Sequence, residues 1–483
     1  MEEKSGAQIS TKAFVQSLLI LLVLMVVAGI LTLIIPTGSY ARLSIDGREI
    51  IDPDSFQSVE RPSYPVWRWF TAPVEVLWGP DGLIIIVIIV FLLMVGSAFA
   101  ALDKSGILKA TVARAVRAFG GRKYLLLCVI SLLFMLVGAF FGIFEEVVPL
   151  VPLMIALSYS LGWDSLTGLG MSILATNMGF SAAVTNPFTI GVAQEIAELP
   201  LFSGAWFRIP VLVGVYIVLI VFLVRHARSV ERDPQNSLVF EQDRVERAKY
   251  GMQQTDALKE ENPRLGKAIG LFLAFFVLIL VVLMSGAFVP AISDIALPLV
   301  GLLFLVGGVA ASLIGGVGGR QVLKAVWEGI LGIAPAIPLI LMAASIKHII
   351  AEGGILDTIL HSASRPFSQA SPFVAALAVY GLALLIEFLV ASGSAKAFLL
   401  MPILLPLADL VGVTRQVTVL AYTFGDGFSN LAYPTNPVLL ICLGLTAVSY
   451  IKWLKWTLRL WLWVILITVA FLALAVAINF GPF

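Results

Sequence analysis

Residues 424–437 read Phe-Gly-Asp-Gly-Phe-Ser-Asn-Leu-Ala-Tyr-Pro-Thr-Asn-Pro, a polar and glycine-rich stretch inside an apolar segment at about 416–446. A second interruption, Thr-Asn-Met-Gly-Phe-Ser-Ala-Ala-Val-Thr-Asn-Pro, occupies residues 176–187. Proline removes a backbone donor and clashes with the preceding turn, so each stretch predicts a helix that is unwound midway. Polar residues and unwound backbone occur within a membrane only where they line protein or a water-filled cavity. The two stretches therefore predict a polar site at the centre of a membrane protein.

The composition indicates a protein that crosses the membrane many times. Hydrophobic residues make up 59% of the 483 residues and charged residues 13%, whereas soluble domains average about 25% charged residues. So few charges cannot cover a water-soluble surface. The net charge is +1 without a block of like charge, so no nucleic-acid partner is expected.

Catalytic or metal chemistry is not predicted. Cys128 and Cys442 lie in apolar runs and form neither a disulfide framework nor a CxxC motif. His226, His348 and His361 all lie in polar stretches, so no intramembrane histidine is expected. A membrane-embedded enzyme would need a nucleophile–base pair or a set of metal ligands there. We therefore predict no enzyme and no cofactor, apart from a sodium ion or a proton as the coupling ion.

Hydropathy predicts an all-α polytopic protein with about nine transmembrane helices and two re-entrant hairpins. Segments 122–162 and 371–411 are each about 40 residues long, with glycine or small polar residues midway. A span needs roughly 20 residues, so each segment either crosses twice or enters and returns. The interrupted segments 166–198 and 416–446 supply two spans. The uninterrupted spans are predicted near 14–35, 82–102, 207–225, 267–289, 295–314, 329–346 and 458–480.

The distribution of lysine and arginine predicts the orientation. Loop 103–123 carries six of these residues and loop 225–267 carries nine, so both are expected in the cytoplasm. Loop 36–81 carries four arginines against seven acids and is expected outside. The protein should lie in the cytoplasmic membrane, with its N-terminus inside and its C-terminus outside. Residues 226–264, of mixed charge, are expected to be a solvated cytoplasmic linker.

The chain repeats itself at an offset of about 250 residues. Thr-Asn-Pro at 185–187 returns at 435–437, and Pro152, Gly162 and Trp206 are matched by Pro402, Gly412 and Trp456. Loop 103–123 is predicted inside and its counterpart near 347–370 outside, so the two units are inverted, as in many secondary transporters. The predicted organisation is scaffold and interface helices at 1–121 and 265–370, transport-domain halves at 122–225 and 371–483, and the linker 226–264.

The polar residues at membrane depth are the candidate site. The hairpin tips lie near 142–149 and 391–396, and helix N-termini exposed at such tips attract anions. The predicted substrate-binding residues are Ser392, Gly393, Ser394, Lys396, Asn186, Asn436, Thr435, Asp426, Ser429 and Asn430. The predicted ion-coupling residues are Glu145, Glu146, Thr176, Asn177, Ser181 and Thr185. Sodium is expected near Asn177, Thr185, Asn186 and Asn430.

For several of the polar residues at membrane depth, the alternative is a purely structural role. Ser181, Thr176 and Thr423 have side chains suited to bonding back to their own helix carbonyls. Asn186 and Asn436 are suited to holding helices together. Lys396 needs an anion at membrane depth, and the sequence offers Glu387, Asp426 or the carboxylate of a substrate, of which we favour the substrate.

These motifs resemble the four-carbon-dicarboxylate anaerobic carrier family, and in particular its YfcC-like branch. The resemblance covers about residues 70–470 and is carried by 392–402, 424–430, 433–435, 144–146, 186–189 and 191–194. It implies a homodimer of inverted-repeat protomers, each with a scaffold domain and a transport domain that moves as an elevator. It also implies that substrate and sodium bind between 142–149, 176–187, 391–396 and 426–436. One departure is Lys396, where the family pattern leads us to expect a neutral residue such as glutamine.

The predicted function is secondary active transport of a small carboxylate-bearing solute, either a dicarboxylate or an amino acid. Transport would be coupled to sodium or protons, or would proceed by exchange. The partners are then a small anion or amino acid, the lipid bilayer and a second copy of the chain. The alternative is a sodium/proton antiporter that uses the same intramembrane carboxylates.

Overall fold

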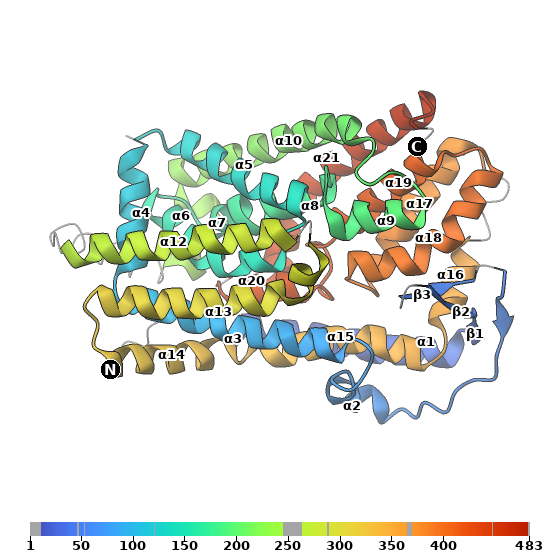
Figure 1. Cartoon of the computed structure of the whole chain (residues 1–483), viewed down its shortest axis with the longest axis horizontal. Helices are drawn as coiled ribbons and strands as arrows, with labels where there is room; N and C mark the ends of the chain where they lie inside the picture. The colour runs from blue at the N-terminus through green and yellow to red at the C-terminus, as the bar shows by residue number, and fades with distance from the viewer. Residues whose placement is uncertain are drawn as a thin grey trace.

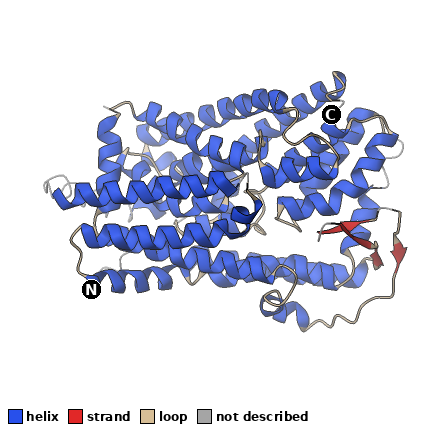
Figure 2. Ribbon diagram, in the orientation of Figure 1, coloured by secondary structure: helices blue, strands red, loops and turns tan. Residues whose placement is uncertain are grey.

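The protein is built almost entirely of helices that run along one long axis (Figures 1 and 2). The computed structural model describes residues 11–45, 48–52, 54–119, 121–244, 263–286, 289–364, 370–446 and 448–481. Within these residues, nine helical segments are long and apolar enough to cross a membrane. The protein is thus a multi-pass membrane protein.

One side of the molecule is a layer of long helices. Its members are α1 (Thr11–Ile34), α3 (Gly82–Lys104), α12 (Pro263–Gly286), α13 (Pro290–Ile314), α14 (Gly319–Ile333) and α15 (Ala336–Glu352). Helix α13 packs against α12 and α3, α3 packs against α14, and α1 packs against α15. The span predicted at 329–346 lies within the candidate span Gly319–Glu352, which a short turn divides into α14 and α15. Pro335 and the nearby Pro338 interrupt the hydrogen bonding there.

The first predicted hairpin consists of α5 (Lys123–Phe141), the 3₁₀ helix η1 (Glu145–Leu150) and α6 (Val151–Ser160). The segment that follows contains α7 (Ser165–Leu169), a π-helical stretch η2 (Gly170–Leu174) and α8 (Ala175–Ala182). Helix α8 ends at Ala183, which has a left-handed φ of 43°. A second π-helical stretch, η3 (Pro187–Gly191), and α9 (Val192–Ile196) continue the chain after the break. The helix is therefore interrupted as predicted, but only over residues 183–186, because residues 176–182 of the predicted stretch belong to α8.

The second hairpin has the same order of elements. It consists of α17 (Pro372–Glu387) and α18 (Gly393–Leu410), followed by α19 (Arg415–Gly427) and α20 (Pro437–Gly444). No helix covers residues 428–436, which confirms the predicted interruption at 426–436. Two long helices, α10 (Ala205–Arg232) and α21 (Tyr450–Ala477), pack together on the side away from α14 (Figure 1).

Two short helices lie at opposite ends of the long axis. Helix α4 (Ile107–Ala118) lies at one end, and α16 (Leu356–Ser364) lies at the other, beside the strands (Figure 1). Helix α2 (Arg68–Glu75) packs on α15. The segments around α4 and α16, which the repeat pairs, therefore lie at opposite ends of the molecule.

Two parts of the structure differ from the sequence prediction. The loop 36–81 contains four short strands, so the fold is not purely helical: β1 (Gly38–Ser39) pairs with β4 (Gln57–Ser58), and β2 (Arg42–Ile45) pairs with β3 (Arg48–Ile51). The described part of the linker 226–264 is also not fully solvated, contrary to the prediction. Residues up to 232 extend α10, η4 (Pro234–Asn236) follows, and Val239 and Asp243 are buried against the core. Residues 245–262 lie outside the described part of the chain.

Candidate functional site

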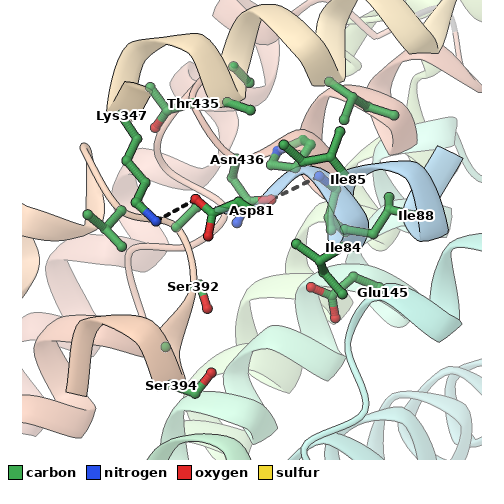
Figure 3. Close-up of a pocket in the computed structure, with 18 of the residues that line it drawn as sticks. Asp81, Ile84, Ile85, Ile88, Glu145, Lys347, Ser392, Ser394, Thr435 and Asn436 are labelled. Atoms are coloured by element: carbon green, nitrogen blue, oxygen red, sulfur yellow. Dashed lines mark hydrogen bonds and ion pairs between the residues drawn. The ribbon is translucent and has the colours of Figure 1, made fainter. Parts of the chain in front are cut away.

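A cavity of about 550 Å³ lies where both hairpin tips and the second helix break meet α3 and α15 (Figure 3). Its polar and charged lining residues come from all of these elements. They are Asp81, Glu145, Glu146, Lys347, His348, Glu352, Ser392, Ser394, Asn430, Thr435 and Asn436. Apolar side chains such as Ile84, Ile88 and Phe180 complete the wall.

The first tip is formed by a glycine that no other residue replaces without strain. Gly142 ends α5 with φ at 67°, which L side chains rarely adopt. A Cβ at this position would lie 2.3 Å from Oδ1 of Asn186. The close approach places the Asn186 amide directly against the tip, and Glu145 and Glu146 follow at the start of η1.

The second tip exposes the N-terminus of a helix. Ser392 is the N-cap residue of α18, and its hydroxyl accepts a hydrogen bond of 3.4 Å from the amide of Ala395. Ser392, Gly393 and Ser394 all line the cavity. Because the first amides of a helix have no intrahelical partner, this end of α18 offers N–H groups and a positive potential to a bound anion.

The two asparagines perform the same task at the two breaks. Oδ1 of Asn186 accepts from the amide of Phe188 at 2.9 Å, and its Nδ2 donates to the carbonyl of Phe180 at 3.1 Å. Oδ1 of Asn436 accepts from the amides of Val438 and Leu439 at 2.9 and 3.3 Å. Each amide therefore caps the helix that restarts after the break. Asn436 also lines the cavity, and Asn186 does not.

Lys396 lies behind the second tip and does not line the cavity. Its ammonium group is 2.6 Å from Oδ1 of Asp426 and also contacts the carboxylate of Glu387. The side chains of all three residues are at most 1% exposed. Of the three anionic partners that the sequence left open, the structure supplies Glu387 and Asp426.

The remaining predicted residues divide into two groups. The hydroxyls of Thr176, Ser181, Thr423 and Ser429 donate to carbonyls four residues earlier in the chain, and Thr185 donates to the carbonyl of Phe140. In contrast, both amide atoms of Asn177 and the hydroxyls of Thr189 and Thr435 have no hydrogen-bond partner among the described residues. Thr176, Asn177, Ser181, Thr185, Asp426 and Ser429 are not part of the cavity lining.

Charged residues that the sequence prediction missed line the side of the cavity formed by α3 and α15. Lys347 donates to Asp81 at 2.6 Å across the cavity wall (Figure 3). His348 lies near the C-terminal end of α15 and also lines the cavity. Its Nε2 is 3.4 Å from Glu75 in α2. In the sequence, Lys347 and His348 form a short polar run at the end of an apolar segment. Such a run predicts a loop and gives no sign of a cavity.

A chain of ion pairs extends from the cavity onto α2. Arg68 binds Glu75 at 2.6 Å and approaches Glu352 at 3.4 Å. The hydrogen bond from Arg68 lowers the pKa of the Glu75 carboxyl below its ordinary value. Glu75 is therefore ionised near neutral pH and holds Arg68 and His348 at the rim.

The cavity carries an excess of acids. Asp81, Glu145, Glu146 and Glu352 contribute carboxylates, whereas Lys347 and His348 contribute the basic groups. The four acidic groups therefore outnumber the two basic groups. Acidic groups thus predominate in the described lining of the cavity.

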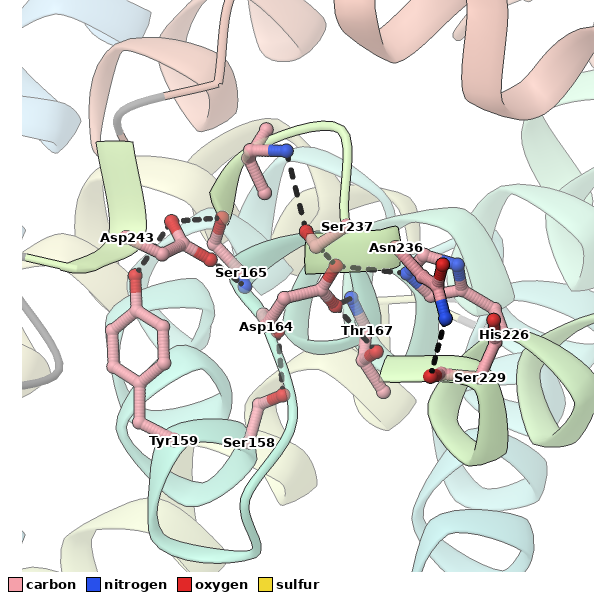
Figure 4. A network of polar contacts seen from close by, with 11 residues as sticks. Ser158, Tyr159, Asp164, Ser165, Thr167, His226, Ser229, Asn236, Ser237 and Asp243 are labelled. Carbon is pink, nitrogen blue, oxygen red and sulfur yellow. Dashed lines mark hydrogen bonds and ion pairs between the residues drawn. The ribbon is translucent and has the colours of Figure 1, made fainter. Parts of the chain in front are cut away.

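The far end of the first broken helix is anchored in a buried polar network (Figure 4). Oδ1 of Asp164 caps α7 at the amide of Thr167, and its Oδ2 accepts from Ser237 at 2.6 Å and contacts Nε2 of His226 at 2.9 Å. Burial acts to raise the pKa of the Asp164 carboxyl, but His226, Ser237 and Thr167 outweigh it and hold this pKa below its ordinary value.

Asp243 attaches the segment after α10 to the same place. It accepts from the amide and the hydroxyl of Ser165 at 2.7 and 2.8 Å and from the hydroxyl of Tyr159 at 3.1 Å. Burial, aided by the nearby charge of Asp164, raises the pKa of the Asp243 carboxyl to about 6. The N-terminus of α7 is thereby held by two carboxylates.

The chain is similar to several known proteins. The family model "DcuC: C4-dicarboxylate anaerobic carrier" matches residues 14–477. The "Putative basic amino acid antiporter YfcC" of Escherichia coli (strain K12) is 32% identical over 482 residues, which cover 92% of this chain and 92% of that protein. An uncharacterized protein of Haemophilus influenzae (strain ATCC 51907 / DSM 11121 / KW20 / Rd) is 26% identical over 371 residues, 76% of this chain and 71% of its own length.

Two solved structures show weaker similarity. The YdaH transporter of Alcanivorax borkumensis is 17% identical with a TM-score of 0.42, covering 97% of this chain and 99% of that chain. MtrF of Neisseria gonorrhoeae, described with a class of antimetabolite efflux pumps, is 18% identical with a TM-score of 0.44, covering 96% of this chain and 95% of that chain. The match to the family model over nearly the whole length confirms the resemblance seen in the motifs, and the chain belongs to the C4-dicarboxylate anaerobic carrier (DcuC) family of membrane transporters.

Proposed function

We propose that this transporter exchanges basic amino acids, or solutes that likewise combine a carboxylate with more than one cationic group, across the cytoplasmic membrane. The observation that carries the proposal is the excess of carboxylates in the cavity. A dicarboxylate entering it would meet charges of its own sign, whereas a basic amino acid would neutralise them. The E. coli relative named as a basic amino acid antiporter supports the same substrate class.

The two tips suit the two ends of such a solute. The carboxylate of the solute would bind the free amides at the N-terminus of α18, at Gly393 and Ser394. Its ammonium and side-chain cation would bind Glu145 and Glu146 on the opposite tip. Asn430 and Thr435 would add hydrogen bonds, and the hydroxyl of Thr435 has no other partner among the described residues. Lys396, Asp426 and Ser429 do not line the cavity, so they would support the residues that contact the solute and would not contact it themselves.

For the transport cycle we propose an elevator motion of two inverted repeats. Residues 122–225 and 371–483 would move as the transport domain against a scaffold formed by 1–121 and 265–370, in a homodimer. The matching order of hairpin, broken helix and long helix in the two halves supports this proposal. Sodium, if it is the coupling ion, would bind near Asn177, Thr185, Asn186 and Asn430, where both amide atoms of Asn177 lack partners in the described structure.

A thermal-shift screen of the purified protein tests the substrate class. Lysine, arginine, succinate and norleucine would be compared with and without sodium, with wild type and Glu145→Gln side by side. We expect the basic amino acids to raise the Tm of wild type, and the rise to shrink in the variant because one carboxylate partner is lost. Stabilisation by succinate but by neither basic amino acid would contradict the proposal.

A sodium/proton antiporter is the second candidate function. The buried carboxylates of Glu387 and Asp426 favour it, because antiport of cations requires acids at membrane depth. Quenching of a pH dye in proteoliposomes after addition of sodium, without any organic solute, would identify this activity. We expect no such signal from wild type.

A further inference from the structure

Lys396 joins three helices through a single buried charge. It lies in the first turn of α18, where its amide donates to the carbonyl of Ser392 at 3.0 Å. Glu387 is the last residue of α17, and Asp426 lies near the end of α19. The ammonium contacts both carboxylates, so it connects the two arms of the second hairpin to the second broken helix.

The cluster contains one cation for two carboxylates. Oε1 of Glu387 and Oδ2 of Asp426 have no hydrogen-bond partner within the described residues. Oδ2 of Asp426 lies below the tip, 3.1 Å from the point where a Cβ on Gly393 would be, so the N-terminus of α18 adds positive potential. Without the ammonium, two acids from different helices would face each other unpaired in a buried place, which is strongly unfavourable.

We propose that the Lys396 ammonium is a tethered cation that stands where a dissolved metal cation would otherwise bridge Glu387 and Asp426. Carboxylate oxygens that converge on one point are the ligands that hard cations prefer. In the structure, a cation on the chain itself fills this place. The second hairpin therefore closes onto α19 without sodium at this position. The inference rests on the proposed function only in that the protein is a transporter.

Removal of the tethered charge should create a sodium site. In Lys396→Gln the two carboxylates remain and the glutamine carbonyl adds a third oxygen, so sodium ions replace the missing ammonium. Lys396→Arg keeps a cation and should not create the site. Lys396→Gln with Asp426→Asn removes one carboxylate and should abolish the gain. Lys123→Gln is the matched control, because Lys123 binds Glu231 at the surface, where both side chains are partly exposed.

The test is the Tm of the purified full-length protein in sodium chloride against choline chloride, without any organic solute, so that its outcome does not depend on the substrate. We expect Lys396→Gln to gain a sodium-specific rise of about 2 °C or more beyond any response of wild type. Lys123→Gln, Lys396→Arg and the double variant should respond as wild type does. Folding of Lys396→Gln in sodium but not in choline would be the same result in a stronger form.

Two outcomes would overturn the proposal. One is a Lys396→Gln protein whose response to sodium equals that of wild type. The other is a Lys396→Gln protein that folds in neither salt while Lys396→Arg folds in both, because the cation would then be required in a form that sodium cannot supply.

Discussion

The first hairpin tip presents Glu145 and Glu146 to the cavity, whereas the second presents a serine-rich helix N-terminus. The charges of the second hairpin, Lys396 with its carboxylate partners, are enclosed behind that tip. The backbone frame is nevertheless shared, since glycine, proline and a capping asparagine recur at an offset of 250 residues. The comparison indicates that the two hairpins share a backbone frame, whereas the residues that their tips present to the cavity differ in charge.

The largest effect is expected from the enclosed charge. In choline buffer, Lys396→Gln should lower the free energy of unfolding by about 3–5 kcal/mol, because it leaves two buried carboxylates without their partner. The double change Lys396→Gln with Glu387→Gln should recover part of the loss, since one buried acid, Asp426, then lacks a cation instead of two. The measurement is thermal unfolding in detergent. If Lys396→Gln alone is as stable as wild type, the ion pairs of Lys396 contribute nothing to the free energy of unfolding.

The first hairpin tip should not tolerate a side chain at Gly142. Gly142→Ala combines a left-handed φ with a Cβ only 2.3 Å from Asn186, whereas Gly162→Ala has the same kind of φ, 88°, and open space around it. We expect Gly162→Ala to cost about 1 kcal/mol of backbone strain. Gly142→Ala should cost more and should also abolish transport. Equal effects in the two variants, in stability and in uptake, would remove the evidence for a tight contact between the tip and the break.

The two capping asparagines provide a symmetric test of the shared frame. Asn186→Ala and Asn436→Ala should each cost about 1 kcal/mol, and serine at either position should restore most of it. Transport should differ between them, because only Asn436 lines the cavity. We expect Asn436→Ser to raise the half-saturating solute concentration and Asn186→Ser to leave it nearly unchanged. Similar losses of affinity in both serine variants would contradict the cavity as described.

The smallest expected effect is a pH dependence of stability that arises only in the first half of the chain. Helix α7 begins at Asp164 and is held by Asp243, whereas its counterpart α19 is capped by the neutral Thr414. Because the pKa of Asp243 is raised to about 6 in the folded state, its proton stabilises the fold at low pH, and this contribution is lost as the pH rises through 6. Tm measured between pH 4 and 8 should show this loss in wild type.

Two variants separate Asp243 from the other acids. Asp243→Asn should flatten the part of the pH profile near 6, because the neutral side chain no longer releases a proton. Thr414→Ala should lower the Tm by a similar amount at every pH. If Asp243→Asn leaves the dependence of Tm on pH unchanged, the group that titrates near pH 6 is not Asp243.

The frame could be predicted from the sequence because its residues have local conformational requirements. Gly142, Gly162 and Gly412 all adopt positive φ, and both Asn-Pro pairs restart helices. The strands at 42–45 and 48–51 had a local signal too, the Asp-Gly pair between two short runs, which is typical of a hairpin turn. It was overlooked in a loop assigned by charge alone.

The partners of the charged residues could not be predicted in the same way. Lys347 and Asp81 are 266 residues apart, and no local pattern relates them. Lys396 had three possible anions in the sequence, and only the packing of α17, α18 and α19 selects two of them. The docking of Asp243 on Ser165 likewise depends on tertiary contacts, which the mixed charge of the linker does not reveal.

Exchange in proteoliposomes tests the central claim that the acidic cavity carries basic amino acids. Vesicles would be loaded with unlabelled lysine, succinate or buffer alone, and the entry of labelled lysine would be followed, with Glu145→Gln as the variant. We expect rapid entry only into lysine-loaded vesicles and a marked loss in the variant. Entry of labelled succinate driven by internal succinate, with no exchange of lysine, would contradict it.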